Sequence, residues 1–136
     1  MAPSIQVTMV LCDAVQSADG KLWMLGGGWT RIAANTPAPQ GLGVIAHVPY
    51  DLTNHVFQLE IRLVDSDGQA VSFGDGPVVA GGEFEIGRPP GIKPGETLTV
   101  PLAFRFNGLA HPPGTYVWEC TVDGEVAARW AFQAAE

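Results

Sequence analysis

Apolar and polar residues alternate along most of this chain, the period-two pattern typical of β-strands. The clearest case runs from residue 56 to residue 63, where every second position is apolar (Phe57, Leu59, Ile61 and Leu63). No segment of ten or more residues carries apolar side chains at the spacing of an amphipathic helix. The pattern therefore predicts an all-β protein.

The same alternation predicts further strands, separated by turns. The first is an apolar stretch over 5–15 that resembles a central strand covered on both faces. Others are expected at 21–25, 29–32, 42–48, 70–73, before residue 86, and at 97–106, where Pro101 indicates an edge position or a bulge. A final hairpin is expected to bury Tyr116, Trp118, Cys120 and Val122 on one strand and Val126, Ala128, Trp130 and Phe132 on the other.

Turn residues fall between these strands at short intervals. Asp-Gly pairs at 19–20, 67–68 and 123–124 suit tight turns, and three prolines exclude regular structure from the loop 87–96. The triglycine at 26–28 predicts a bulge or a bulky neighbour lying across bare backbone. We expect one domain over residues 1–136, an antiparallel two-sheet immunoglobulin-like sandwich of about eight strands, with a closed barrel as the alternative.

Composition narrows the partners and the compartment. The 136-residue chain is 46% apolar and only 15% charged, and its formal charge is −7 with just two lysines and five scattered arginines. Binding to nucleic acid or to an anionic membrane surface needs clustered cations, so neither partner is expected. The N-terminus lacks the basic region of a signal peptide and no stretch is long enough to span a bilayer, so we expect a cytoplasmic protein.

The two cysteines, Cys12 and Cys120, both lie in expected strands. The simplest interpretation is a pair of buried thiols in a reducing compartment. A disulfide would require their strands to be neighbours with Cα atoms less than about 7 Å apart. The sequence leaves that pairing open.

Candidate catalytic and metal-binding residues form no recognised constellation. The histidines His47, His55 and His111 have no metal-ligand spacing, and Asp65 and Asp67 fit a turn better than a calcium loop. Glu83 and Glu85 share a strand face and could serve as a hydrolase carboxylate pair, but a solvated strand face is the favoured explanation because no accompanying polar site can be named. We expect no cofactor, no metal and no enzymatic activity.

Aromatic and proline-stiffened segments remain as candidates for recognition. Two tryptophans bracket the triglycine, and rigid loops lose little conformational entropy when they dock a partner. The candidate interaction surface therefore comprises Trp23, Trp29, Arg88, Pro89, Pro90, Ile92 and His111. The competing interpretation places all four tryptophans of the chain in the core.

Several short motifs together resemble a bacterial, mostly actinobacterial, domain family of unknown function. They are Leu11-Cys12-Asp13-Ala14, Ala18-Asp19-Gly20-Lys21-Leu22, Gly26-Gly27-Gly28-Trp29, Gly87-Arg88-Pro89-Pro90-Gly91 and Pro113-Gly114-Thr115-Tyr116-Val117-Trp118. The similarity spans nearly the whole chain. It implies a small stand-alone β-sandwich and carries over no catalytic residue.

The leading hypothesis is a non-enzymatic interaction or assembly module that binds a protein partner or self-associates through an edge strand. It could be a structural or accessory component of a larger complex, such as a phage or injection-system particle. The alternative is a module that binds carbohydrate or another small ligand on an exposed aromatic platform. That alternative requires Trp23 or Trp29 to face solvent.

Overall fold

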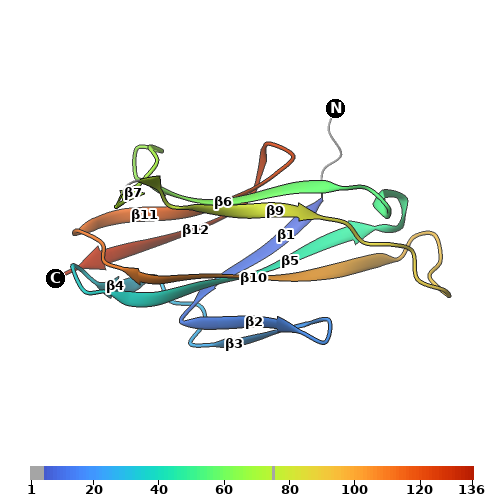
Figure 1. Ribbon diagram of the computed structural model, residues 1–136, viewed down its shortest axis with the longest axis horizontal. Coiled ribbons are helices and arrows are strands. Elements are labelled where there is room, and N and C mark those ends of the chain that lie inside the picture. Colours follow the sequence, from blue (N-terminus) through green and yellow to red (C-terminus); the bar gives the residue numbers. More distant parts are fainter. Residues whose placement is uncertain (1–4, 75) are drawn as a thin grey trace.

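The computed structural model describes residues 5–74 and 76–136, and two larger sheets dominate it (Figure 1). The smaller of the two has the strand order β1-β5-β10 and the larger has the order β4-β12-β11-β6-β9. Neighbouring strands are antiparallel except for β12 and the short β4, which run parallel. The strands are β1 (Gln6–Cys12), β5 (Ala38–Pro49), β10 (Thr97–Leu109), β4 (Arg31–Ala33), β12 (Glu125–Ala135), β11 (Gly114–Val122), β6 (Phe57–Asp65) and β9 (Val79–Phe84).

Two small hairpins and one helical turn complete the described fold. They are β2 (Ala14–Ala18) with β3 (Lys21–Leu25), β7 (Ser72–Phe73) with β8 (Gly76–Pro77), and the 3-10 turn η1 (Tyr50–Leu52). The all-β prediction is confirmed. The strand count exceeds the expected eight because the first apolar stretch breaks at Asp13 into β1 and β2 and because short pairings add β4, β7 and β8.

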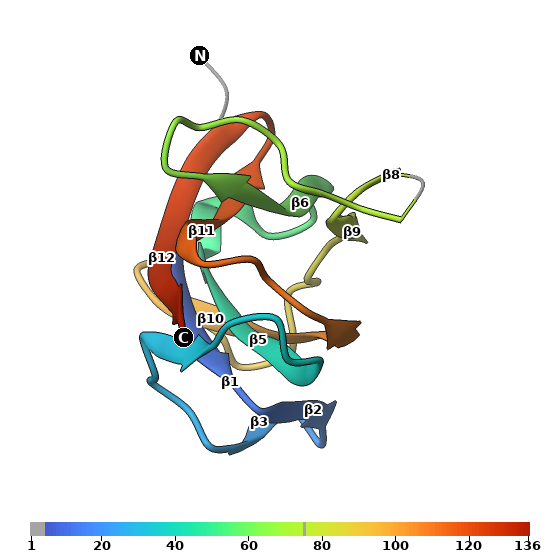
Figure 2. The same cartoon turned by 90° about the vertical axis from the view of Figure 1, so that its left-hand side faces the viewer.

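The core lies between the two larger sheets, which curl around it as an open half-barrel (Figure 2). Leu11, Leu42 and Val44 enter it from the smaller sheet, and Phe57 and Trp118 enter from the larger one, all fully buried. The alternation predicted for β6 and for the face of β11 is confirmed, because their inward residues are all buried. Within the described residues, no helix is long and apolar enough to cross a bilayer.

The return strand β12 differs from its prediction at Val126. A β-bulge between Cys120 and Thr121 places Val126 opposite Thr121 instead of on the buried face, and its side chain is exposed. A bulge inserts one residue and so reverses the face that the following residues use. Val126 therefore lies on the outer face, whereas Phe132 is buried as expected.

The β2–β3 hairpin forms a third layer on the outer face of the smaller sheet, at the bottom of Figure 1. It can approach closely because β5 has glycine at two positions beneath it. A Cβ at Gly41 would lie 2.9 Å from Cγ1 of Val15, and one at Gly43 would lie 2.8 Å from Sδ of Met24. The close approach of the hairpin thus occurs at Gly41 and Gly43. The triglycine 26–28 lies in the loop that follows β3, where Gly26 has a φ of +62° and the Asp13 side chain occupies the space that a Cβ would need, so the predicted close neighbour is found there too.

The apolar stretch of the first strand had indicated a central position in the sheet, and this prediction is wrong. β1 pairs only with β5 and lies at an edge of its sheet. Near its end at Cys12 both faces are nevertheless covered, since Leu11 packs in the core while Cys12 lies near Gly41 on the side of the hairpin. A third layer therefore gives an edge strand the apolar pattern of a central one.

The half-barrel is open between β9 and β10, which are the end strands of their sheets. The edge position indicated by Pro101 is confirmed, since β10 pairs only with β5. On the other side, β1 lies close to β12. The gap between β9 and β10 is called the seam below.

Substituting Gly41→Ala should lower stability by about 1–3 kcal/mol, because the new methyl group overlaps Val15, which is short, branched and buried. Thermal and urea unfolding of the variant measure the loss. Gly27→Ala is the matched control, since a Cβ there would meet its neighbours at 3.5 Å or more. Equal stability of the two variants would contradict the close packing of the hairpin.

Candidate functional site

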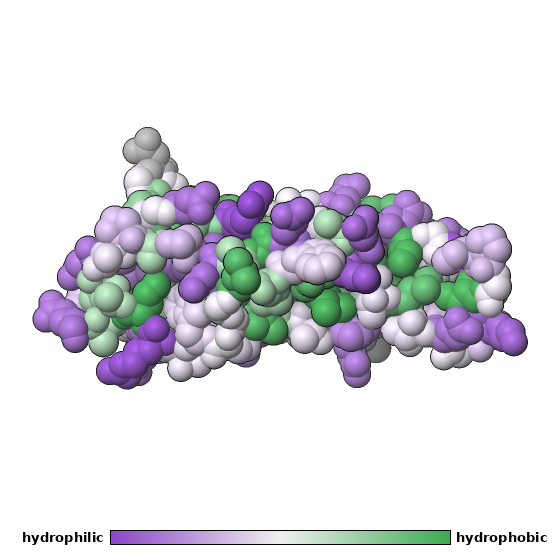
Figure 3. Space-filling view, turned by 90° about the horizontal axis from the view of Figure 1, so that it is seen from below, coloured by the Kyte–Doolittle hydropathy of each residue, from purple (hydrophilic) through white to green (hydrophobic). Residues whose placement is uncertain are grey.

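The outer face of the β2–β3 hairpin presents a row of exposed apolar side chains. Trp23 is 55% exposed and Leu25 is 73% exposed, although both belong to a regular strand. Direct cross-strand pairs share one face of a hairpin, which defines the hairpin face as Ala14, Gln16, Ala18, Lys21, Trp23 and Leu25. Figure 3 views this side of the molecule, where hydrophobic residues lie exposed among hydrophilic ones.

The Trp23 ring is held in place before any partner arrives. Its indole N–H donates a hydrogen bond to the carbonyl oxygen of Ala18 at 3.2 Å. The Lys21 ammonium lies 5.9 Å from the centre of the ring, within the range of a cation–π interaction. A fixed aromatic side chain loses little entropy on binding, so Trp23 is suited to anchor a contact.

A hollow of about 360 Å³ lies beside this tryptophan. Hairpin residues form most of its wall, and the Arg105 side chain of β10 completes it. The hollow is mainly apolar but offers the Gln16 amide and the Arg105 guanidinium as hydrogen-bond donors. It can therefore accept an apolar group together with an oxygen acceptor.

The loop 87–96 lies apart from the hairpin face, at the right-hand end of Figure 1. Arg88 is exposed, but its guanidinium donates hydrogen bonds to Thr53 and to the hydroxyl and carbonyl oxygens of Tyr50, and it stacks 3.8 Å from the Tyr50 ring. These contacts fix the loop to η1. Pro89 and Pro90 are exposed and Ile92 is half-buried.

Two residues of the predicted surface contribute instead to the packing around Phe132. Trp29 is half-buried and meets the Phe132 ring edge-on at 5.7 Å, and His111 is only 2% exposed and packs on Tyr116 and Phe132. Placing His111 on an interaction surface is therefore wrong. Its neighbouring prolines suggested a loop tip, whereas the rings of Tyr116 and Phe132 pack against the imidazole.

His111 is held as a neutral ring. Its Nε2 lies 2.6 Å from the side-chain amide of the buried Gln40, within hydrogen-bonding distance. Burial lowers the pKa of His111, which favours the uncharged imidazole.

The carboxylates and histidines considered for catalysis do not meet. His47 contacts Thr8 at 2.9 Å, and His55 lies 3.5 Å from a carboxylate oxygen of Asp123. Glu83 accepts a hydrogen bond from the Gln58 amide at 2.7 Å. Each histidine thus has a different partner, and no cluster of three potential metal ligands occurs within the described residues.

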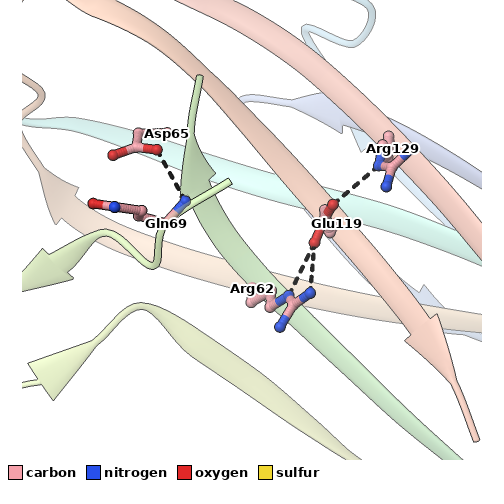
Figure 4. A network of polar contacts seen from close by, with 5 residues as sticks. All are labelled: Arg62, Asp65, Gln69, Glu119 and Arg129. Atoms are coloured by element: carbon pink, nitrogen blue, oxygen red, sulfur yellow. Dashed lines mark hydrogen bonds and ion pairs between the residues drawn. The ribbon is translucent and has the colours of Figure 1, made fainter. Parts of the chain in front are cut away.

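The outer face of the larger sheet carries a charge ladder across three strands (Figure 4). The Glu119 carboxylate accepts from Arg62 at 2.9 Å and from Arg129 at 3.0 Å. Burial raises the pKa of Glu119, but hydrogen bonds and charge from the two arginines outweigh it and the net pKa is lowered. The ladder ties β6, β11 and β12 together and leaves one net positive charge.

The turn after β6 uses its own acidic side chain. The Asp65 carboxylate accepts hydrogen bonds from the backbone N–H groups of Asp67 and Gln69, as Figure 4 shows for Gln69. Gly68 takes a positive φ of 79° in this turn. The prediction of a structural turn here is confirmed.

The two cysteines are buried and unpaired, as the simpler interpretation expects. Burial raises the pKa of Cys12 and raises that of Cys120 to about 11. Both thiols therefore stay protonated at neutral pH.

Sequence analysis found Trp23 but missed the neighbours that complete the site. Leu25 was readable from the alternation of Lys21, Trp23 and Leu25, which places all three on one face. Arg105 lies on β10, 80 residues along the chain, and only the tertiary structure brings it to the hollow. The Glu119 ladder likewise required the register of three strands.

Replacing Glu119 with Gln should lower stability at pH 7 by about 1–2 kcal/mol, because both arginines lose their acceptor charge. The lowered pKa means that this stabilisation is present above the ordinary value of 4.5 and is lost as the pH falls below it. Urea unfolding at pH 7 and pH 2.5 checks both statements. The control Glu60→Gln, on the same exposed face, should change stability by less than about 0.5 kcal/mol.

The buried His111 should make the protein less stable as the pH falls from 7 to 5. The unfolded chain takes up a proton near pH 6.5, whereas the folded ring resists protonation, so acid favours unfolding. A His111→Gln variant should show a flatter dependence of unfolding free energy on pH over this range. Parallel curves for the two proteins would contradict the assignment of a neutral ring.

Comparison with known proteins gives a family without a described activity. A search of curated proteins finds no match. One family model, described as a family of unknown function (DUF6941), matches residues 7–135, nearly the whole length of the chain. This protein therefore belongs to that family of unknown function, DUF6941.

Proposed function

We propose that this protein is a non-enzymatic interaction module that docks a protein partner on its hairpin face. The observation that carries the proposal is the pair Trp23 and Leu25, the two most exposed large apolar side chains on one strand. Exposed apolar residues gathered on one face typically mark a binding surface. The hydrogen bond from the Trp23 indole to Ala18 orients the ring, as suits an interface anchor.

The partner that fits this face offers an apolar surface with carboxylates at its border. Lys21 and Arg105 flank the exposed apolar side chains, and neither forms an ion pair within the described residues. A carboxylate on the partner would complement these cations and fix the orientation of docking.

The absence of enzymatic activity is part of the proposal. Among the described residues, those with shifted pKa values lie in the core or in the charge ladder, and none of them lines the hollow beside Trp23. Active sites usually combine a cavity with shifted titratable groups. We further propose a cytoplasmic, immunoglobulin-like component of a larger assembly. The two free, buried cysteines support a reducing compartment, and the two antiparallel sheets around one core support the fold.

A double variant, Trp23→Ser with Leu25→Ser, tests the docking face. Tagged wild-type and variant proteins are used to co-purify partners from a lysate of the native host, and each partner is then produced and titrated calorimetrically. Loss of a tryptophan anchor should weaken binding at least about 30-fold, equivalent to about 2 kcal/mol. The variant should fold normally because both side chains point to solvent.

The matched control is the pair Val56→Ser with Phe73→Ser, which removes comparable exposed apolar side chains elsewhere. A partner retained by this control and lost by the hairpin variant supports the proposal. A partner bound equally by both variants would refute the hairpin face as the docking surface.

The second candidate function is binding of a small ligand. The exposed Trp23 ring favours it, because a sugar can stack on an aromatic ring that faces solvent. A sugar ring could lie on the indole while the Gln16 amide and the Arg105 guanidinium bond its hydroxyl groups. Titration with oligosaccharides, followed by tryptophan fluorescence, tests it. Saturable quenching that is abolished by Trp23→Ala would favour the sugar, and no change up to millimolar concentration would exclude the sugars tested.

A further inference from the structure

The seam between β9 and β10 leaves part of the core incompletely covered. On β5, Leu42, Val44 and Ala46 are fully buried. Their direct cross-strand neighbours on β10, which face the same core, are only half-buried: Phe104, Leu102 and Val100. Since paired residues share a face, the difference arises because, among residues 5–74 and 76–136, no strand continues the sheet beyond β10.

The seam contains a mainly apolar hollow of about 200 Å³. Leu59, Phe84, Leu102 and Phe104 contribute its apolar walls. Gly82 of β9 lies opposite the buried Leu59, at a position that should carry a core side chain, and a Cβ there would meet nothing within 4 Å. The hollow is thus space that a side chain of the edge strand would ordinarily fill.

The two edges of the seam differ in their ability to pair with another strand. Proteins protect exposed edges with proline, with lysine or with covering segments. β10 carries Pro101 in mid-strand, and the Ser17 hydroxyl of the hairpin donates to the Pro101 carbonyl oxygen at 3.1 Å. β9 (Val79–Phe84) contains neither proline nor a basic residue, and Glu83 is its single charged residue, so its outer edge is the less protected of the two.

The charge beside this edge indicates what could pair with it. Glu83 lies on β9 and Glu85 directly follows it, both exposed, and neither forms an ion pair within the described residues. The bond from Gln58 orients the Glu83 carboxylate without neutralising it. Opposite charges on directly paired residues stabilise a sheet and like charges destabilise it.

We propose that β9 accepts an extended segment of a partner protein as an additional antiparallel strand. Alternate apolar side chains of that segment would fill the hollow at Gly82, and a lysine or arginine on its other face would lie beside Glu83. A second copy of this chain fits poorly, because its own β9 would bring a second Glu83 and a net charge of −7. This proposal is independent of the hairpin face.

A synthetic peptide tests the proposal directly. The probe is the nine-residue peptide Lys-Val-Thr-Val-Thr-Val-Thr-Val-Lys, added to the full-length protein and followed by NMR. Amide hydrogen exchange should slow at least tenfold along residues 79–84, and the signals of Leu102 and Phe104 should shift. Gly82→Val, which fills the hollow, should weaken binding at least tenfold.

A charge swap keeps the test decisive if Gly82→Val does not fold. Glu83→Lys alters only an exposed side chain, and it should weaken binding of the lysine peptide and strengthen binding of the same peptide with glutamate at both ends. The Trp23→Ser, Leu25→Ser protein should bind the lysine peptide like wild type, which separates this surface from the hairpin face.

Several results of the peptide experiment would overturn the proposal. They are unchanged exchange along β9 at millimolar peptide, slowed exchange confined to β10 or to the hairpin, and an affinity that neither the Gly82 nor the Glu83 variant alters. Sedimentation that shows a dimer whose amide protection maps to β9 would likewise overturn it, in favour of a second copy.

Discussion

The position of the β2–β3 hairpin depends on the lack of side chains on β5 at Gly41 and Gly43. Without side chains there, Val15, Leu22 and Met24 can pack against the sheet from outside. In a two-stranded ribbon with one face so engaged, the alternate residues must point away. The exposure of Trp23 and Leu25 therefore follows from two missing Cβ atoms on another strand.

The outer face of the larger sheet is stabilised by charged side chains and not by a covering layer. There the register aligns Arg129, Glu119 and Arg62 across three strands, so charge pairing stabilises a surface that no third layer covers. The two outer faces of the half-barrel thus differ in chemistry. Ion pairs between side chains link the strands on the outer face of the larger sheet. The outer side of the smaller sheet, covered by the hairpin, presents apolar side chains to solvent.

Local pattern predicted the elements better than their arrangement. Alternation located β6, β11 and the hairpin turn at Asp19-Gly20, since a strand face depends only on its own residues. It misassigned β1, because cover by a third layer and cover by neighbouring strands give the same apolar pattern. It also failed at Val126, where one bulge residue exchanges the two faces.

The candidate site shows the same division. Trp23 was identifiable as an aromatic residue near flexible glycines, but its exposure depends on glycines about 20 residues later. His111 looked like a loop residue because prolines follow it, although its ring is enclosed by Tyr116, Phe132 and Gln40. Burial of a single polar side chain depends on contacts distant in sequence, which composition does not reveal.

The placement of the two thiols has a practical consequence. Cys120 faces the central core and Cys12 lies on the hairpin side of the smaller sheet, so a layer of protein separates their side chains. A disulfide between them would require that layer to open, and both groups react slowly because they are buried and protonated. Alkylation by a maleimide therefore reports opening of the fold, and the native chain supplies its own label sites without added cysteines.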